Sequence, residues 1–396
     1  MKKQMKWKRN IRLYYTFRIF CTMNFVMPIF MLFLIDKGLS SFEIFVTQAV
    51  YTATELILTI PSGAFADKVG RKRTLILSTV LYALGFVSYG YSSTFVHILL
   101  AEIVFAVSSA AFHGTGEAFI YDTLAEAKQE KRYKRALGTA YALQSFVMGA
   151  CSVAGGLMAK HSLALPYLVS ALPISLSMVP LFFLEEPRRD KQESTAYLDM
   201  IKEAMVFTVQ HKKLRNLMYF GAATTLTGFM AFLLYQPMLT GMGLPVEYLG
   251  VAIMTLSVAH GIGNKLAHRF EKKLGHLDLL AISAGFRALL YLLVFLARGP
   301  YLLVWAILID LTAGITSPIF SEWMNRYSKS ENRATVLSIM SMSGMLSFTV
   351  FSPLFGLFID VYSEQLCYLL LAMIIGMYAL RQLAVALFAR RAAAAG

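Results

Sequence analysis

Ionisable side chains stand in the middle of long apolar segments, where an ionised group is costly. They are three glutamates, an aspartate and a histidine: Glu55, Glu102, Glu117, Asp310 and His113. An ionised side chain at the centre of a bilayer costs about 2.5–3.5 kcal/mol unless it faces a cavity or a partner. A carboxyl group in an apolar cavity also holds a proton more readily than one in water. These residues are therefore candidates for carrying protons, or for binding a polar substrate, inside a membrane.

Helical spacing places several of these side chains together. At about 100° per residue, Glu102, His113 and Glu117 fall on one stripe of the segment 96–123, while Asp122 points roughly the other way. Glu55 lies on a similar polar stripe of the segment 42–66. We expect these stripes to line a cavity.

A buried cation is predicted to face one of the acids. Arg18 and Glu117 each lie about six residues from the same membrane surface, which places both at a depth of ~9 Å. This predicts an Arg18–Glu117 ion pair. Glu55 and Glu102 would then be the better proton carriers.

Composition predicts a polytopic membrane protein as the scaffold for these residues. Of the 396 residues, 57% are hydrophobic and 15% are charged. A membrane-spanning helix needs about 20 mostly apolar residues, and twelve segments come near that length. They lie at about 13–35, 42–66, 74–92, 96–123, 138–160, 163–184, 215–240, 246–267, 277–298, 300–325, 335–361 and 365–388. The predicted fold is all-α, with no soluble domain.

Lysine and arginine gather on one side of the predicted membrane. The N-terminus, alternate loops and the C-terminus hold nearly all of the 37 such residues, whereas the opposite loops hold only Lys37, Lys160 and Arg298. By the positive-inside rule we expect a cytoplasmic-membrane protein with both termini in the cytoplasm. The formal net charge of +14 then reflects topology, and no nucleic-acid partner is expected.

The sequence holds no loop for ATP hydrolysis, no dinucleotide-binding fingerprint and no HExxH or GxSxG motif. Cys21, Cys151 and Cys367 stand in separate spans without paired spacing. We therefore expect no enzyme activity, no cofactor and no metal. Any concentrative work must come from an ion gradient.

A polar stretch at 185–214 separates six spans from six. It predicts an N-terminal bundle over 1–184, a cytoplasmic linker with an interfacial helix near 197–210, and a C-terminal bundle over 215–396. Weak similarity between AFADKVGRK and HRFEKKLGH supports two repeats related by a pseudo-two-fold axis. One chain would thus hold a complete pathway, so we expect a monomer.

The loop GAFADKVGRKRT, which begins at Gly63, follows the second predicted span. It resembles the signature loop G-x-x-x-D-x-x-G-R-[RK] of the major facilitator superfamily, here Gly63, Asp67, Gly70, Arg71, Lys72 and Arg73. Gly63 would allow two helices to approach closely, and Gly70 would allow a tight turn. The resemblance implies a latch in which Asp67 and Arg71 also engage Asp122 and the start of the eleventh helix near residues 334 and 335.

The architecture resembles the twelve-helix bacterial drug:proton antiporters of that family, although Glu102 stands where they usually carry an arginine. The first hypothesis is an exporter that exchanges protons for a lipophilic cationic or neutral small molecule. One alternative is an importer, a uniporter, or a carrier of sugars, amino acids or siderophores, in which Arg18 or Arg287 holds an anionic group. A remote alternative is a membrane sensor, or an intramembrane enzyme that uses His113 with Glu117.

Overall fold

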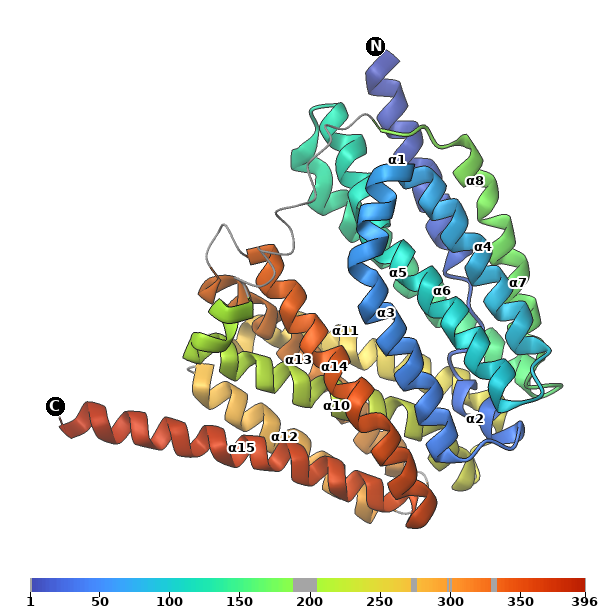
Figure 1. The fold of residues 1–396 in the computed structure, drawn as a ribbon. Coiled ribbons are helices and arrows are strands. Elements are labelled where there is room, and N and C mark those ends of the chain that lie inside the picture. Colours follow the sequence, from blue (N-terminus) through green and yellow to red (C-terminus); the bar gives the residue numbers. More distant parts are fainter. Residues whose placement is uncertain are drawn as a thin grey trace. The chain divides into compact units, whose positions relative to one another are not determined.

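The computed structural model describes residues 2–187, 205–271, 276–297, 299, 301–328 and 333–395, and within these ranges it contains helices and no strand (Figure 1). Eleven of the described helical segments are long and apolar enough to cross a membrane. The first predicted span is also helical but interrupted. Counted with it, the fold has the twelve spans and two six-helix halves that the sequence predicts.

The chain packs as two compact units. Unit 1 comprises residues 1–39, 46–194 and 246–251, and unit 2 comprises residues 40–45, 195–245 and 252–396. The helices of the first half are α1 (Lys2–Cys21), α2 (Phe30–Asp36), α3 (Ser41–Val69), α4 (Arg71–Gly90), α5 (Phe95–Glu126), η1 (Glu130–Arg132), α6 (Tyr133–Ala159), α7 (Leu165–Leu176) and α8 (Met178–Phe183). Those of the second half are α10 (Lys212–Gly241), η3 (Val246–Tyr248), α11 (Leu249–Glu271), α12 (His276–Leu296), α13 (Tyr301–Tyr327), α14 (Arg333–Val361) and α15 (Glu364–Ala395). Most of the predicted linker helix at 197–210 lies outside the described residues.

The first predicted span is broken between α1 and α2, so the expectation of one continuous helix over 13–35 is wrong. In the break, the Asn24 side chain accepts a hydrogen bond from the backbone N–H of Val26, at 2.8 Å. Pro28 follows, and proline disfavours helical backbone in the residue before it. A Cβ atom at Gly155 of α6 would lie 1.8 Å from the carbonyl oxygen of Phe25. Only glycine therefore allows this irregular segment to pack on α6.

Unit 1 holds its helices together with small side chains and aromatic rings. Between α4 and α5, Ser78 Oγ donates to the carbonyl of Ser108 at 3.0 Å, and Ser108 Oγ donates to the carbonyl of Ser78 at 2.8 Å. Short polar residues let two membrane helices approach closely while they satisfy their own hydrogen bonds. The buried rings of Tyr14 and Phe119 stack at a centroid distance of 6.0 Å. This packing fixes α1 against α5.

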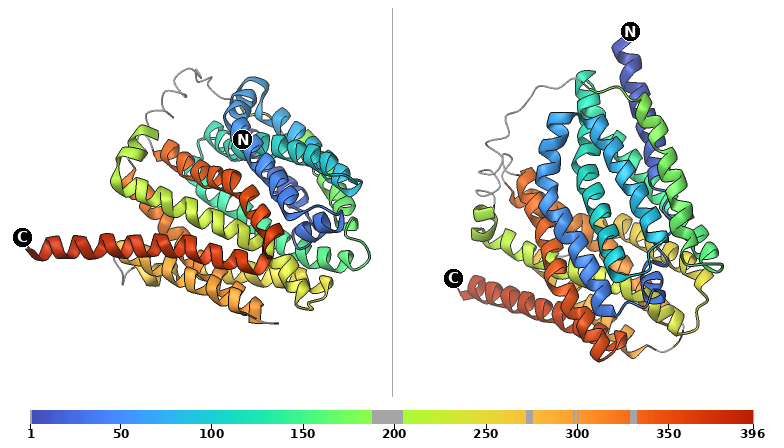
Figure 2. Two further views of the ribbon diagram at one scale, coloured as in Figure 1. Left: turned by 60° about the horizontal axis from the view of Figure 1, so that its bottom comes forward. Right: turned by 45° about the vertical axis from the view of Figure 1, so that its right-hand side comes forward.

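Unit 2 is built from two long helix pairs. Helix α12 lies along α15, and α10 packs along α14 (Figure 2). Asn216 of α10 and Gln382 of α15 exchange two amide hydrogen bonds, at 2.8 and 2.5 Å. The first turn of α3 also belongs to this unit, because the backbone N–H groups of Ser41 and Phe42 each donate to the carboxylate of Asp360 at 2.8 Å. These bonds satisfy donors that every helix start leaves open.

Candidate functional site

The basic loop after α3 gathers the charges that its pattern predicts. Arg71 Nη2 lies 2.9 Å from Asp67 Oδ1, and Arg71 Nε lies 3.4 Å from Asp122 Oδ2 at the end of α5. Gly70 has a φ of +112°, a backbone angle that residues other than glycine rarely adopt. At Gly63, a Cβ atom would meet no atom of the described residues within 4 Å, so the predicted close approach of helices is not seen among them. The predicted partner side chains at 334 and 335 lie outside the described ones.

A further acid contacts this loop from the end of the first bundle, and it was not predicted from the sequence. The Glu186 carboxylate accepts hydrogen bonds from the backbone N–H groups of Arg71 at 2.6 Å and Lys72 at 2.8 Å. Gly70 is the N-cap of α4 and has no side chain that could accept these bonds. A negative group at a helix N-terminus also interacts favourably with the helix dipole. The signal in the sequence is a glycine N-cap combined with an acid just after the first bundle. Arg73, the last basic residue of the predicted signature, is exposed.

Two candidate residues from different helices meet in unit 1. Glu55 of α3 is 5% exposed, and its Oε1 lies 2.8 Å from Nδ1 of His113 on α5. Ser109 Oγ donates to the same carboxylate oxygen at 2.6 Å. The His113 side chain is 68% exposed, so the trio links a buried acid to an open surface. Sequence reasoning named both Glu55 and His113 but did not predict their contact.

Glu102 has a different environment, although it shares a helix with His113. It is 3% exposed, and its Oε1 accepts hydrogen bonds from Gln48 Nε2 at 2.5 Å and from the hydroxyl of Tyr89. The ring of Tyr89 stacks on Tyr167 at a centroid distance of 5.0 Å. Glu102 is therefore a hydrogen-bonded core residue of unit 1.

A cavity of about 170 Å³ lies between α1, α5 and α6, all within unit 1. We call it the Arg18 pocket. Its lining includes aromatic, charged and amide side chains, among them Tyr14, Arg18, Phe112, His113, Glu117 and Gln144. His113 belongs both to this lining and to the Glu55 contact. The pocket is thus connected to the buried carboxylate.

Arg18 and Glu117 line this pocket without pairing, so the predicted ion pair is wrong. Arg18 Nη2 donates to Gln144 Oε1, and the guanidinium lies over the Phe112 ring at 4.8 Å. Glu117 instead accepts a hydrogen bond from the Tyr141 hydroxyl. Equal depth in the membrane does not fix the direction in which each side chain points. The neutral partners on α6, Gln144 and Tyr141, could not be recognised from the sequence.

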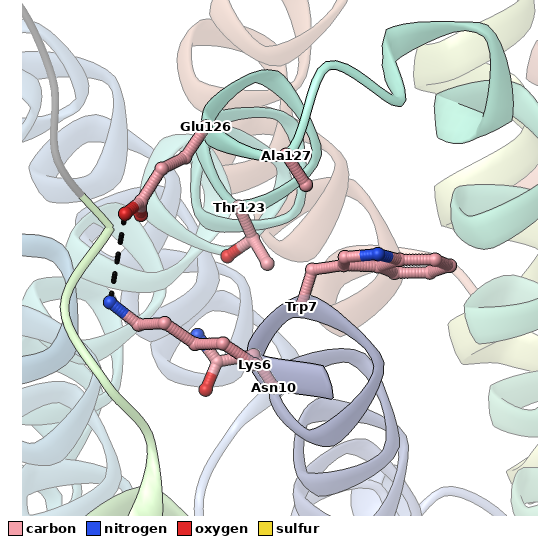
Figure 3. A pocket seen from close by; sticks show the side chains of 6 residues that line it. All are labelled: Lys6, Trp7, Asn10, Thr123, Glu126 and Ala127. Atoms are coloured by element: carbon pink, nitrogen blue, oxygen red, sulfur yellow. Dashed lines mark ion pairs between the residues drawn. The ribbon is translucent and has the colours of Figure 1, made fainter. Parts of the chain in front are cut away.

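A second, much smaller hollow lies between the start of α1 and the end of α5. Figure 3 shows Lys6 and Trp7 near Thr123 and Glu126, with an ion pair of 3.7 Å between Lys6 Nζ and Glu126 Oε1. Its volume of about 10 Å³ is enough for about one water molecule. This hollow is too small for an organic substrate.

The charged candidates of the second half belong to unit 2. Arg287 of α12 is 6% exposed, Asp310 of α13 is half-buried, and neither forms an ion pair within 4.0 Å of a described residue. Two further charged side chains of this unit are exposed: Glu322, and Arg381, which lies over the ring of Tyr219 at 5.2 Å. Arg287 is still near enough to Asp310 to interact with it electrostatically, so the role predicted for Asp310 stays a prediction.

Comparisons with known proteins agree with the fold. A model of the Major Facilitator Superfamily matches residues 15–309 and 215–396. The chain is 22% identical to an uncharacterized MFS-type transporter, YxaM of Bacillus subtilis (strain 168), over 85% of both chains. It is 23% identical to a class H tetracycline resistance protein of Pasteurella multocida, over 82% of this chain and 80% of the relative.

Solved structures of transporters share the fold. The nucleoside transporter NupG aligns with a TM-score of 0.72 and 12% identity, over 97% of this chain and 99% of the other. A D-xylose-proton symporter aligns with a TM-score of 0.71 and 14% identity, over 95% and 96% of the two chains. At these identities the similarity concerns the arrangement of the helices and not the substrate.

Proposed function

The chain belongs to the major facilitator superfamily and is a multi-pass membrane transporter rather than an enzyme, and on that premise we propose that it works as a proton-coupled exporter. Its substrate is a lipophilic small molecule, cationic or neutral. The chain acts as a monomer in the cytoplasmic membrane, with both termini in the cytoplasm, as the distribution of lysine and arginine favours.

The observation that carries this proposal is the position of His113. Its ring lines the Arg18 pocket, and its Nδ1 lies 2.8 Å from the buried carboxylate of Glu55. A proton that arrives on either group changes the charge at the wall of the pocket. Ligand binding and protonation are therefore energetically linked, which is the requirement for coupled transport.

Competition between proton and substrate follows from the acids in this region. Glu117 is exposed in the same pocket, and only one of its oxygens has a donor among the described residues. A proton and a cationic substrate group both neutralise such a carboxylate, so one displaces the other. Exchange of the two across the membrane is antiport.

The Asp67–Arg71–Asp122 cluster supplies the second element of the mechanism. It ties the end of α3 to the end of α5 through one guanidinium. We assign to it the role of a latch that is closed in one state of the transport cycle and open in another. The relative from Pasteurella multocida is a tetracycline resistance protein, and export of a drug is one way in which a transporter confers resistance.

A second candidate is an importer or symporter of a polar or anionic solute. The observation in its favour is Arg18, a buried cation in the pocket without an acidic partner among the described residues. The solved relatives are described as nucleoside and xylose transporters. The direction of proton movement that a substrate evokes separates the two candidates.

The test is proton release by the purified protein in weakly buffered solution. Ethidium as a lipophilic cation, chloramphenicol as a neutral drug and xylose as a sugar are added in turn. We expect a ligand that binds to release protons from the wild type and from the control Glu43→Gln, which changes an acid at the start of the same helix. Glu55→Gln should release none. Equal release by Glu55→Gln would refute the role of Glu55, and proton uptake on binding would favour the symporter.

A further inference from the structure

The Arg18 pocket carries a charge pattern that neither a simple cation nor an uncharged drug satisfies. Arg18 is 7% exposed, and its guanidinium is held between the Gln144 amide and the Phe112 ring. Its Nε is buried and has no acceptor within the described part of the chain. No described carboxylate lies within 4.0 Å of it. A buried cation without a counter-charge is costly, and a ligand that brings an anion offsets that cost.

Glu117 supplies the opposite charge in the same pocket. It is exposed, it is bonded only to the Tyr141 hydroxyl among the described residues, and it stands apart from Arg18. A purely cationic ligand would leave Arg18 unpaired, and a purely anionic one would leave Glu117 unpaired. A ligand with both charges matches both side chains, and mismatched charges in an interface cost affinity.

Size and lining describe the rest of the ligand. The cavity of about 170 Å³ is below the roughly 300–1,000 Å³ of pockets for drug-sized molecules. Its wall includes the rings of Tyr14, Phe112 and Tyr141. A ring system of the ligand can stack on such side chains. The pocket therefore fits a single small aromatic group better than a large polycyclic drug.

From these contacts we propose that the pocket binds a small aromatic zwitterion, whose anionic group pairs with Arg18 and whose cationic group pairs with Glu117. This inference rests on the proposed transport function. It narrows the substrate from cationic or neutral molecules to molecules that are neutral overall and carry one charge of each sign.

The test uses four ligands that share an indole ring and differ in charge. They are tryptophan as the zwitterion, tryptamine as the cation, indole-3-propionate as the anion and indole-3-ethanol as the neutral probe. Binding to the full chain in lipid nanodiscs is measured by calorimetry at neutral pH. We expect tryptophan to bind at least about tenfold more tightly than each of the others, which corresponds to one added charged contact.

Variants assign each charge. Arg18→Gln should weaken tryptophan and indole-3-propionate by about tenfold and leave tryptamine unchanged, whereas Glu117→Gln should weaken tryptophan and tryptamine and leave indole-3-propionate unchanged. Arg135→Gln is the matched control, since Arg135 is an exposed arginine of α6 outside the pocket lining. If Arg18→Gln does not fold, Arg18→Lys keeps the charge but loses the planar fork, and tryptophan binding should fall by a smaller factor.

Three results would overturn the inference: equal affinities for tryptophan and tryptamine, the same loss for every ligand in each variant, or no binding of any of the four. The same measurements distinguish a failure of the proposed proton-coupled export from a failure of the zwitterion inference. If ethidium still releases protons while tryptophan does not bind, the exporter stands and the zwitterion is wrong. If tryptophan binds with the predicted charge pattern but moves no proton, the pocket assignment stands and proton coupling is wrong.

Discussion

Glu55 and Glu102 show that two membrane-embedded acids of similar burial can have different roles. Both are less than a tenth exposed. Glu55 contacts His113, which opens on the Arg18 pocket, whereas Glu102 is bonded to Gln48 and Tyr89 within the core. From their positions in the sequence, both residues are predicted to carry protons. Their hydrogen-bond partners separate them.

The first residue-scale prediction concerns Glu102. Glu102→Ala removes the acceptor of the buried Tyr89 hydroxyl and of the partly buried Gln48 amide, so we expect it to lower the free energy of unfolding by about 1–3 kcal/mol. Glu102→Gln keeps an acceptor oxygen and should lose less. Both variants should keep substrate-induced proton release in the fraction that folds. Thermal unfolding and proton release are measured on the same preparations, and loss of proton release in a stable Glu102→Gln protein would return this residue to the coupling site.

At the residue scale, the sequence identifies the charged candidates but not the residues that they contact. The charged candidates could be named because ionised groups are rare within apolar segments. Their pairings could not, because a pairing depends on the rotation of each helix and on neutral partners. Gln144 is such a partner: an amide on α6 does not stand out in a sequence, yet it binds Arg18.

At the scale of single elements, hydropathy predicts spans well and interruptions poorly. Helices α3 and α10 begin and end within a few residues of the predicted segments, because a bilayer requires a fixed length of apolar helix. The break between α1 and α2 is invisible to hydropathy. It depends on the hydrogen bond from Val26 to Asn24 and on Pro28.

The N-terminus of α4 gives the prediction that belongs to this scale. Glu186→Ala leaves the N–H groups of Arg71 and Lys72 without their acceptor, and a lost helix cap costs about 1 kcal/mol. We expect the amide hydrogens of these two residues to exchange about fivefold faster, measured by hydrogen–deuterium exchange.

Glu185→Ala is the matched control for this prediction. Its side chain contacts Lys6 and Arg9 of α1 rather than the start of α4. Exchange at Arg71 and Lys72 should therefore stay at the wild-type rate in the control. The same rate in Glu186→Ala would show that the carboxylate does not cap α4.

At the scale of the whole molecule, the transport cycle requires contacts that open and close. The Asp67–Arg71–Asp122 cluster is the candidate, and Arg71→Ala removes both of its ion pairs. We expect this variant to lower the rate of transport at least about tenfold while it changes the Kd of the ligand less than twofold. The exposed Arg73 provides the control, and Arg73→Ala should change neither value. An equal loss of rate and affinity in Arg71→Ala would indicate a binding defect and not a latch.

The two-halves fold and the membership in a transporter family follow from features spread over the entire chain, which is why the sequence could predict them. Twelve apolar segments, one polar interruption and one loop pattern are sufficient. Substrate choice depends on a few side chains in one pocket. The side chains of the Arg18 pocket therefore bear on the substrate more directly than membership in the family does.

The most direct test of proton-coupled export is the dissipation of a pH gradient in proteoliposomes that contain the purified protein. Ethidium, chloramphenicol, xylose and tryptophan are added in turn to wild type, Glu55→Gln and Glu43→Gln. We predict that at least one of them triggers proton flux in wild type and in Glu43→Gln, and none in Glu55→Gln. Transport of a ligand without proton flux, or full flux in Glu55→Gln, would contradict antiport through the Glu55–His113 pair.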